Sequence, residues 1–260
     1  MKTKRLLIIA IFAVLTTSAF AIVRTVSNNT NSPGQYTSLQ AAVDASGITG
    51  DTIMVAGSPT SYGNVTIGKQ LVLVGAGWHN PYGYNTIVDA IYLVRSNDFV
   101  NSAGTKIMGF YVTSMVYFQP WSGGGFFAPV NILIERCYIN GADFGYNQHI
   151  NAVTFENDTI RNCFIATYLG IDDASYPSTY GAGGIHIHNN FFNGAYLNGG
   201  GANQSYIFVR NNVFVNRASS VFNSNVYNWV IENNIFYAAY PTAATNSALT
   251  KNIGYMCPDM

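Results

Sequence analysis

One eight-residue phrase recurs in the second half of the chain, and it constrains the fold more than any other feature. It reads IHIHNNFF from Ile185, IFVRNNVF from Ile207 and WVIENNIF from Trp229, so the three copies are evenly spaced. A fixed period of roughly 20 to 50 residues is typical of a solenoid, because each repeat can bury its apolar face only against its neighbours. The phrase therefore predicts a stack of similar coils.

When further copies of the phrase are aligned, the residues at each of its eight positions form a column, whose members are expected to lie above one another in the stack. Copies also begin at Ile132 and Val153, and a partial copy runs from Ala248 to Tyr255. The third and eighth positions are apolar and are expected to fill the core. The third position contains Ile134, Phe155, Ile187, Val209 and Ile231, and the eighth contains Ile139, Ile160, Phe192, Phe214 and Phe236.

The fifth and sixth positions of the phrase are mostly asparagine. Asparagine tolerates a left-handed backbone, and its amide both donates and accepts hydrogen bonds. We therefore expect a ladder of asparagines bonded along the stack, because buried polar groups must find partners. A row of sugar-binding amides is the alternative if the column faces solvent. The pairs are Arg136–Cys137, Asn157–Asp158, Asn189–Asn190, Asn211–Asn212 and Asn233–Asn234.

The segment 1–21 has the features of a secretory signal peptide. Lys2, Lys4 and Arg5 precede the apolar run 6–15, and an A-x-A site ends at Ala21. The run is too short to span a membrane, so we expect cleavage after Ala21 and a secreted or cell-surface protein with no membrane span.

Composition excludes several classes of function for the remaining chain. Apolar residues make up 48% and charged residues only 9% of the sequence, which suits many short strands and excludes a disordered chain. Without the leader, nine basic and twelve acidic residues give a net charge of −3, and no basic patch for nucleic acid is present. Cys137, Cys163 and Cys257 lack metal-ligand spacing, and the first two fall at different repeat positions, so we expect small buried apolar residues.

The segment that follows the leader begins with an amphipathic helix and continues as short strands. The helix is predicted at 38–45 (SLQAAVDA), with Ser38 as its cap and an apolar face that covers the first coil. Strands follow in GDTIMVAG and KQLVLVGAG, on either side of Tyr62-Gly63-Asn64. This order resembles the start of right-handed parallel β-helix proteins of the pectin lyase-like superfamily, in particular secreted bacterial members, and the resemblance extends from Ser38 to about Tyr255.

The resemblance implies an all-β fold, a right-handed single-stranded parallel β-helix with a short N-terminal capping helix. The expected organisation is a signal peptide (1–21), an N-terminal segment with the helix (22–50) and a β-helix (51–260) that is incomplete at its C-terminal end. Superfamily members include lyases, hydrolases, esterases and non-catalytic surface proteins. Asp143-Phe144-Gly145 is similar to one motif of pectin methylesterases, but its spacing differs and the partner motifs are missing. The polygalacturonase and pectate lyase signatures are also absent.

The fourth position of the phrase is the column best suited to a catalytic or metal-binding site. It contains Glu135, Glu156, His188, Arg210, Glu232 and Lys251. Stacked coils would bring Glu156, His188 and Arg210 together on the outer face as catalytic candidates. A solvated row of mutually compensating charges is the alternative. His186 and His188 form an H-x-H pair, which would need a third ligand such as His149, Glu156 or Asp172 to bind a metal.

One coil contains about ten additional residues, between Val153 and Ile185, and insertions of this kind often hold binding sites. Asp172 and Asp173 lie in it, so we predict possible calcium ligands there and include Asp172 as a catalytic candidate. Ordinary turn chemistry is the alternative. Aromatic residues suggest a sugar platform, either here or in the loop around Trp121, unless they anchor the loops. The predicted substrate-binding residues are Trp121, Tyr168, Tyr176, Tyr180 and Glu232.

Two functional hypotheses follow from the sequence. The first is a secreted or cell-surface β-helix that binds carbohydrate, or forms an adhesive or structural surface, without catalysis. The second is a polysaccharide lyase or glycoside hydrolase that acts on an acidic polysaccharide such as pectin. In both, the partner is a polysaccharide or a cell-surface glycan.

Overall fold

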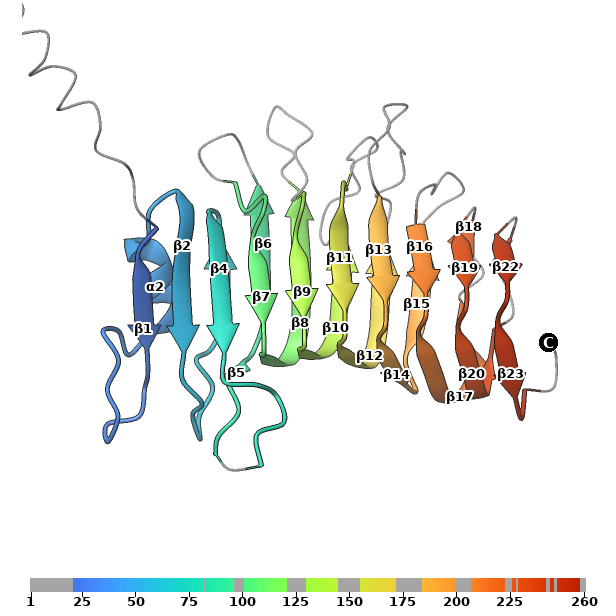
Figure 1. Cartoon of the computed structure of the whole chain (residues 1–260), viewed down its shortest axis with the longest axis horizontal. Coiled ribbons are helices and arrows are strands. Elements are labelled where there is room, and N and C mark those ends of the chain that lie inside the picture. Colours follow the sequence, from blue (N-terminus) through green and yellow to red (C-terminus); the bar gives the residue numbers. More distant parts are fainter. Residues whose placement is uncertain are drawn as a thin grey trace, which may run out of the picture.

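Two long parallel sheets wrap around one apolar core, so the predicted parallel β-helix is confirmed (Figure 1). The computed structural model describes residues 21–81, 83–95, 101–120, 130–144, 155–171, 184–199, 207–222, 226–227, 229–241, 244–245 and 247–257. Along the stack, successive coils add strands to both sheets, and the strands of neighbouring coils pair in parallel. The one described helix, α2 (Leu39–Ala45), lies at the N-terminal end.

Sheet A contains the first strand of each coil. Its ten strands, in spatial order, are β1 (Val23–Val26), β2 (Thr49–Val55), β4 (Gln70–Gly75), β7 (Lys106–Met108), β9 (Leu133–Glu135), β11 (Asp158–Arg161), β13 (Ile185–His188), β16 (Ile207–Arg210), β19 (Val230–Glu232) and β22 (Ala248–Thr250).

Sheet B contains the second strand of each coil. Its main order is β3 (Val65–Ile67), β6 (Ile91–Arg95), β8 (Tyr111–Pro120), β10 (Tyr138–Phe144), β12 (Phe164–Ile171), β14 (Phe191–Asn193), β17 (Val213–Ser220), β20 (Ile235–Tyr240) and β23 (Ile253–Tyr255). Two further strands, β5 (Ile87–Val88) and β15 (Tyr196–Gly199), pair with β8 and β12. A separate pair consists of β18 (Val226–Tyr227) and β21 (Ala244–Thr245).

The predicted helix forms where the sequence places it. The Ser38 hydroxyl accepts a hydrogen bond from the Ala41 N–H at 3.3 Å, which satisfies one of the free donors of the first turn. Leu39, Ala42 and Val43 are buried in the core. None of the described helices is long and apolar enough to cross a membrane.

The register around β11 differs from the sequence alignment. Ile160 pairs with Ile134 and Ile187, so this copy begins at Asp158 and reads DTIRNCFI. The predicted start at Val153, with Phe155 in the third position, is therefore wrong. The error arose because two adjacent segments, VTFEN at 153–157 and DTIRN at 158–162, share the same pattern. Each has an apolar third residue, a charged fourth residue and Asn as its fifth. Asn157, at a φ of 54°, instead forms the bend that precedes β11 and bonds to Asn131 at 3.2 Å.

The corrected register separates the two asparagine columns by role. From β9 to β22, the fifth position is exposed and left-handed, with φ between 53° and 59° at Arg136, Asn162, Asn189, Asn211, Asn233 and Lys251. The sixth position points inward as Asn190, Asn212 and Asn234, which are fully or almost fully buried. Each of these side-chain oxygens accepts the N–H of the preceding coil's sixth residue at 2.9 Å. The predicted structural ladder is confirmed.

Cys137 and Cys163 occupy the same sixth column on neighbouring coils, so the prediction that they fall at different positions is wrong. Both side chains are buried, as expected for small apolar residues. The Cys137 sulfur accepts the Phe110 N–H at 3.5 Å, as the asparagine oxygens do further along the stack. Burial in the core raises the pKa of the Cys163 thiol well above its ordinary value.

Asp158 is a carboxyl group inside the core. Its Oδ1 accepts the Ile132 N–H at 2.9 Å, while Oδ2 is buried without a hydrogen bond to a described residue. Burial, together with the nearby Glu156 carboxylate, raises the pKa of Asp158 well above its usual value. The folded protein therefore favours the protonated form, and its stability falls as the pH rises from the unfolded pKa of about 3.9 through the folded one.

Asp158→Asn should therefore stabilise the protein at high pH, because asparagine keeps the acceptor for Ile132 and cannot ionise. We expect a higher urea midpoint than wild type at pH 8 and little change at pH 4. The control is Asp89→Asn, which removes an exposed carboxylate and should shift the midpoint equally little at both pH values. The same midpoint difference for Asp158→Asn at pH 4 and pH 8 would contradict the prediction.

Candidate functional site

The charged column forms a row on the outer face of sheet A, with two changes of membership. Thr250 pairs with Glu232, so the predicted fourth-position residue Lys251 lies instead at the left-handed fifth position. The aligned residues are Glu135, Arg161, His188, Arg210 and Glu232, so Arg161 replaces the predicted Glu156 beside His188. Arg161 binds Glu135 at 3.1 Å, and Arg210 binds Glu232 at 2.7 Å. The row therefore has an ion pair at each end and His188 in its centre.

The electrostatics of this row are those of mutually compensating charges. Burial raises the pKa of Glu135, but hydrogen bonds from Arg161 and Asn162 outweigh this effect and hold that pKa below its usual value. Partial burial and the flanking Arg161 and Arg210 lower the pKa of His188, so its imidazole is neutral at pH 7. The predicted contact between Glu156 and His188 does not form. The catalytic roles of His188 and Arg210 stay predictions.

The other predicted site residues lie apart from this row or outside the described chain. Tyr168 donates to the buried Asp143 carboxylate at 3.2 Å and stacks on Tyr196 at 5.7 Å. His186 stacks on Phe208 at 4.9 Å, and no group of three metal-ligating side chains occurs among the residues that the structure describes. The residues that fall outside the described chain are Trp121, His149, Asp172, Asp173, Tyr176 and Tyr180.

A different site is built by the chain that leaves β4. After Gly75, residues 76–81 and 83–86 make an excursion from the coil before β5 begins. Its start is fixed on the next coil by a hydrogen bond from the Gly77 N–H to the Gly109 carbonyl at 2.9 Å. A Cβ on Gly75 would collide with that same oxygen, so only glycine allows this close approach.

The excursion places Trp78 over the outer face of sheet B. The Trp78 ring lies 5.8 Å from the rings of both Tyr138 and Phe164, although these residues belong to later coils. Beneath it runs a ladder of aromatic side chains, in which Tyr138 and Phe164 stack at 4.9 Å and Phe164 and Phe191 lie 5.5 Å apart. The side chain of Phe191 is 40% exposed, so the ladder reaches solvent.

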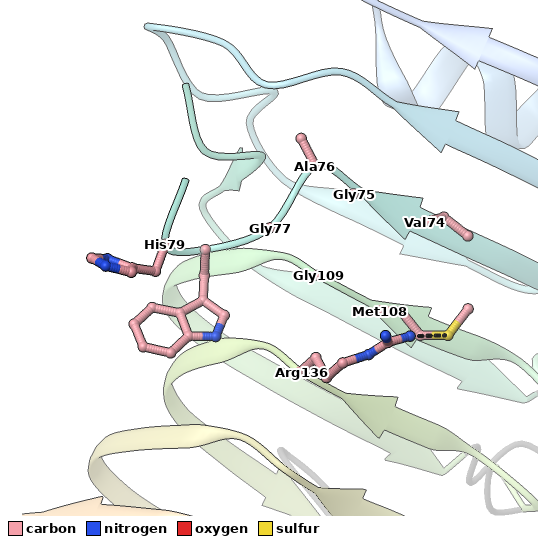
Figure 2. Close-up of a pocket in the computed structure, with 9 residues that line it drawn as sticks. Val74, Gly75, Ala76, Gly77, His79, Met108, Gly109 and Arg136 are labelled. Carbon is pink, nitrogen blue, oxygen red and sulfur yellow. Dashed lines mark hydrogen bonds between the residues drawn. The ribbon is translucent and has the colours of Figure 1, made fainter. Parts of the chain in front are cut away.

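Two hollows flank Trp78. The smaller, of about 400 Å³, lies against β4 and β7, where Figure 2 shows Arg136 and Met108 pointing toward each other across adjacent coils. The larger, of about 650 Å³, extends along the stack, and we name it the Trp78 groove. The Trp78 groove is lined by Trp78, Asn162, Cys163, Phe164, Asn189, Asn190, Phe191, Asn211 and Val213.

The lining of the Trp78 groove combines flat rings with exposed amides. Asn189 and Asn211 stand at the left-handed fifth position, and neither side chain hydrogen-bonds to a described residue. Each amide therefore has donors and an acceptor open to a ligand. No ionisable carboxylate, amine or imidazole is among the described residues that line the groove. The arrangement suits an uncharged ligand that has apolar faces and many hydroxyl groups.

Sequence reasoning missed Trp78, although a signal was present. The segment GAGWHNPYGYN follows the predicted strand in KQLVLVGAG and adds length to its coil. The insertion after Val153 was selected because it lengthens its coil, and the same reasoning applies to this segment. What the sequence did not reveal is where the excursion lies, because its contacts are with much later coils, those of Tyr138 and Phe164.

Comparisons with known proteins leave the family open. The chain matches no known protein-family profile and no curated protein. Among solved structures it is similar to the deglycosylated form of the pectin methylesterase from Aspergillus niger, with 15% identity and a TM-score of 0.41. The match covers 92% of this chain and 87% of that chain. A likeness this distant carries no information about activity, so the function is judged from the Trp78 groove itself.

Proposed function

We propose that this protein binds carbohydrate through the Trp78 groove, without catalysis, as a secreted or cell-surface β-helix. The observation that carries the proposal is the exposed aromatic ladder beneath Trp78, which lies beside amides with open hydrogen-bonding groups. Aromatic rings pack against the apolar faces of pyranose rings, and amides exchange hydrogen bonds with sugar hydroxyls.

The repeat geometry favours a linear polysaccharide as the ligand. Neighbouring parallel strands lie about 4.8 Å apart, so the groove offers similar groups at regular intervals along the stack. Asn162, Asn189 and Asn211 come from three successive coils. Because the described residues that line the groove include no carboxylate, amine or imidazole, we expect it to accept neutral sugar segments at least as well as acidic ones.

Trp78→Ala should weaken binding most among single changes in the groove. Loss of one stacking face is expected to cost about 1.5 kcal/mol or more, which corresponds to about tenfold in the dissociation constant. A panel of neutral and acidic oligosaccharides, measured by calorimetry, provides the test. The matched control is Tyr237→Ala, which removes an exposed ring of sheet B that stacks on Tyr255 and does not line the groove.

Asn189→Gly tests the amides separately from the backbone. Glycine accepts the φ of 59° at this position, so the change removes only the side chain. We expect affinity to fall about threefold to tenfold, the effect of one net hydrogen bond. Asn233→Gly is the matched control, because it lies in the same column but outside the groove. Equal effects of these two changes, or no glycan bound by the wild type, would overturn the proposal.

The catalytic alternative, a lyase or hydrolase acting on an acidic polysaccharide, stays a prediction. Among described residues it depends on the neutral His188 between two arginines. Its test is the release of unsaturated or reducing ends from acidic polysaccharides, with and without calcium. Turnover that His188→Ala abolishes would replace the binding proposal with this one.

A further inference from the structure

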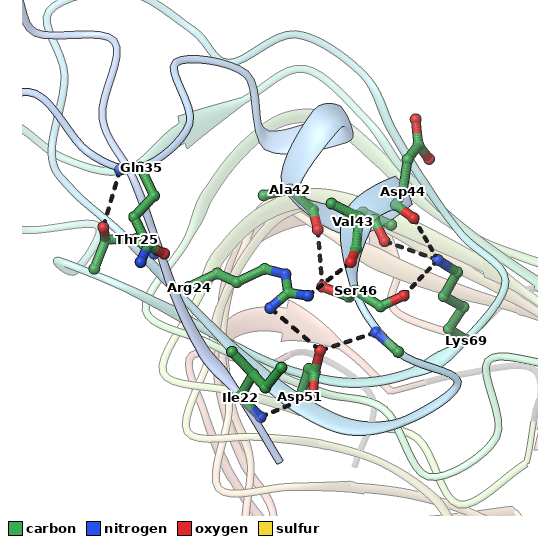
Figure 3. Close-up of polar contacts among 12 residues, drawn as sticks. Ile22, Arg24, Thr25, Gln35, Ala42, Val43, Asp44, Ser46, Asp51 and Lys69 are labelled. Atoms are coloured by element: carbon green, nitrogen blue, oxygen red, sulfur yellow. Dashed lines mark hydrogen bonds and ion pairs between the residues drawn. The ribbon is translucent and has the colours of Figure 1, made fainter. Parts of the chain in front are cut away.

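The first strand is held by a buried carboxylate that accepts a hydrogen bond from Ile22. Asp51, only 3% exposed, accepts the Ile22 N–H at 2.8 Å through Oδ1 and the Gly47 N–H at 2.9 Å through Oδ2. Arg24 lies 3.5 Å from Oδ2 and also donates to the Ala45 carbonyl at 2.7 Å. Figure 3 shows Ile22, Arg24 and the chain that follows α2 gathered around Asp51, which belongs to β2.

Ile22 is also the residue that follows the predicted cleavage site. Ala21 and Ile22 are both exposed, so the bond between them lies at the surface of the folded chain. The position of Ile22 N is fixed by the pairing of β1 with β2, in which Val23 aligns with Thr52. Cleavage after Ala21 would therefore leave the new amino group within hydrogen-bonding distance of Asp51.

We propose that the Ala21–Ile22 bond is a processing site and that the ammonium released there forms an ion pair with Asp51. In the reaction a signal-peptidase-type protease uses one water molecule to hydrolyse the amide, which leaves a carboxylate on Ala21 and an amine on Ile22. That amine takes up a proton at neutral pH. A single neutral N–H donor then becomes a charged group with three donors, and the hydrogen bond to Asp51 becomes charge-assisted.

The surroundings of Asp51 keep it ionised and ready for this partner. Burial raises the pKa of its carboxyl, but hydrogen bonds from Ile22 and Gly47 and the charge of Arg24 outweigh burial and lower that pKa. Lys69 also faces this region, where its ammonium donates to the carbonyls of residues 43, 44 and 46 at the end of α2. The Asp44 carboxylate points elsewhere and binds Gln40 at 2.8 Å.

The ion pair would fix the exposed edge of sheet A after the leader is removed. β1 is the terminal strand of that sheet, and Ile22 immediately precedes it. Pairing with Asp51 raises the pKa of the Ile22 amine above the ordinary value of about 7.7 to 8.0. The resulting stabilisation is fully present below the ordinary pKa and is lost as the pH rises through the raised one.

The test begins with the N-terminus of the exported full-length protein, determined by intact mass spectrometry. We expect Ile22 as the first residue. The folded stability of chains that begin at Ile22 and at Ala21 is then compared, each with Asp51 or Asp51→Asn. The Ala21 chain is the matched control, because its Ile22 nitrogen is a neutral amide. The Ile22 chain should melt at the higher temperature at pH 6.5, and this advantage should disappear in Asp51→Asn.

A chemical readout keeps the test decisive if Asp51→Asn does not fold. The Ile22 amine in the native protein should react with an acylating reagent at least about tenfold more slowly than in the urea-unfolded chain, since each unit of raised pKa removes tenfold of the free amine. A different mature N-terminus, equal melting temperatures of the two Asp51 chains, or equal acylation rates would each overturn the proposal.

Discussion

Asn212→Ala should unfold at a much lower urea concentration than the wild type. The Asn212 oxygen accepts the Asn190 backbone N–H at 2.9 Å and the Asn190 side-chain N–H at 3.1 Å. Its amide nitrogen donates to the Ile187 carbonyl at 2.9 Å and to the Asn234 oxygen at 3.1 Å. Alanine leaves the buried Asn190 N–H without its acceptor and removes one hydrogen bond each from the Asn190 amide, the Ile187 carbonyl and the Asn234 oxygen. The Asn190 amide keeps the Ile160 carbonyl, and the Asn234 oxygen keeps the backbone N–H of residue 212. A buried group left unsatisfied costs about 1–3 kcal/mol.

Because such costs are not additive, we expect a total loss of about 3–5 kcal/mol in the free energy of unfolding. Asn211→Gly is the matched control. It changes the adjacent asparagine, keeps the left-handed backbone at a φ of 55° and removes an exposed side chain, so its midpoint should stay close to wild type. A loss for Asn212→Ala no greater than that for Asn211→Gly would show that the ladder is not a major source of stability.

Phe214→Ala should destabilise the protein by a similar amount through a different mechanism. The Phe214 ring is stacked between Phe192 at 4.5 Å and Phe236 at 5.0 Å, and Phe222 meets it edge-on at 5.9 Å. Truncation removes buried apolar surface and leaves a cavity that rigid neighbouring coils cannot close. The expected cost is about 3–5 kcal/mol, measured by urea unfolding followed by circular dichroism.

The comparison with an exposed ring isolates burial as the cause. Tyr237→Ala removes an aromatic residue that is 44% exposed, and its cost should stay below about 1 kcal/mol. Phe214→Leu should fall between the two, because leucine refills part of the cavity. If Phe214→Ala and Tyr237→Ala had equal urea midpoints, the stacked phenylalanines would not form the stabilising core.

Four features could be predicted from the amino-acid sequence alone: the solenoid, the phenylalanine column, the buried asparagine ladder and the helix capped by Ser38. These features depend on local chemistry that repeats: alternation sets which side chains point inward, and the left-handed bend selects asparagine in successive coils. Because the pattern recurs several times with the same period, a misalignment of one copy does not change the predicted fold. The copies at Ile185, Ile207 and Trp229 therefore aligned correctly.

Two features follow only from the packing of the folded chain: the register of the copy at Asp158 and the position of Trp78. Two overlapping phrases lie between residues 153 and 162, and strand pairing with β9 and β13 selects the second. That choice brings Cys137 and Cys163 into one column and replaces Glu156 with Arg161 beside His188. The Trp78 groove depends on contacts between an excursion and later coils. Such long-range contacts produce no repeating pattern in the sequence, because the residues that the excursion contacts depend on how the whole stack packs.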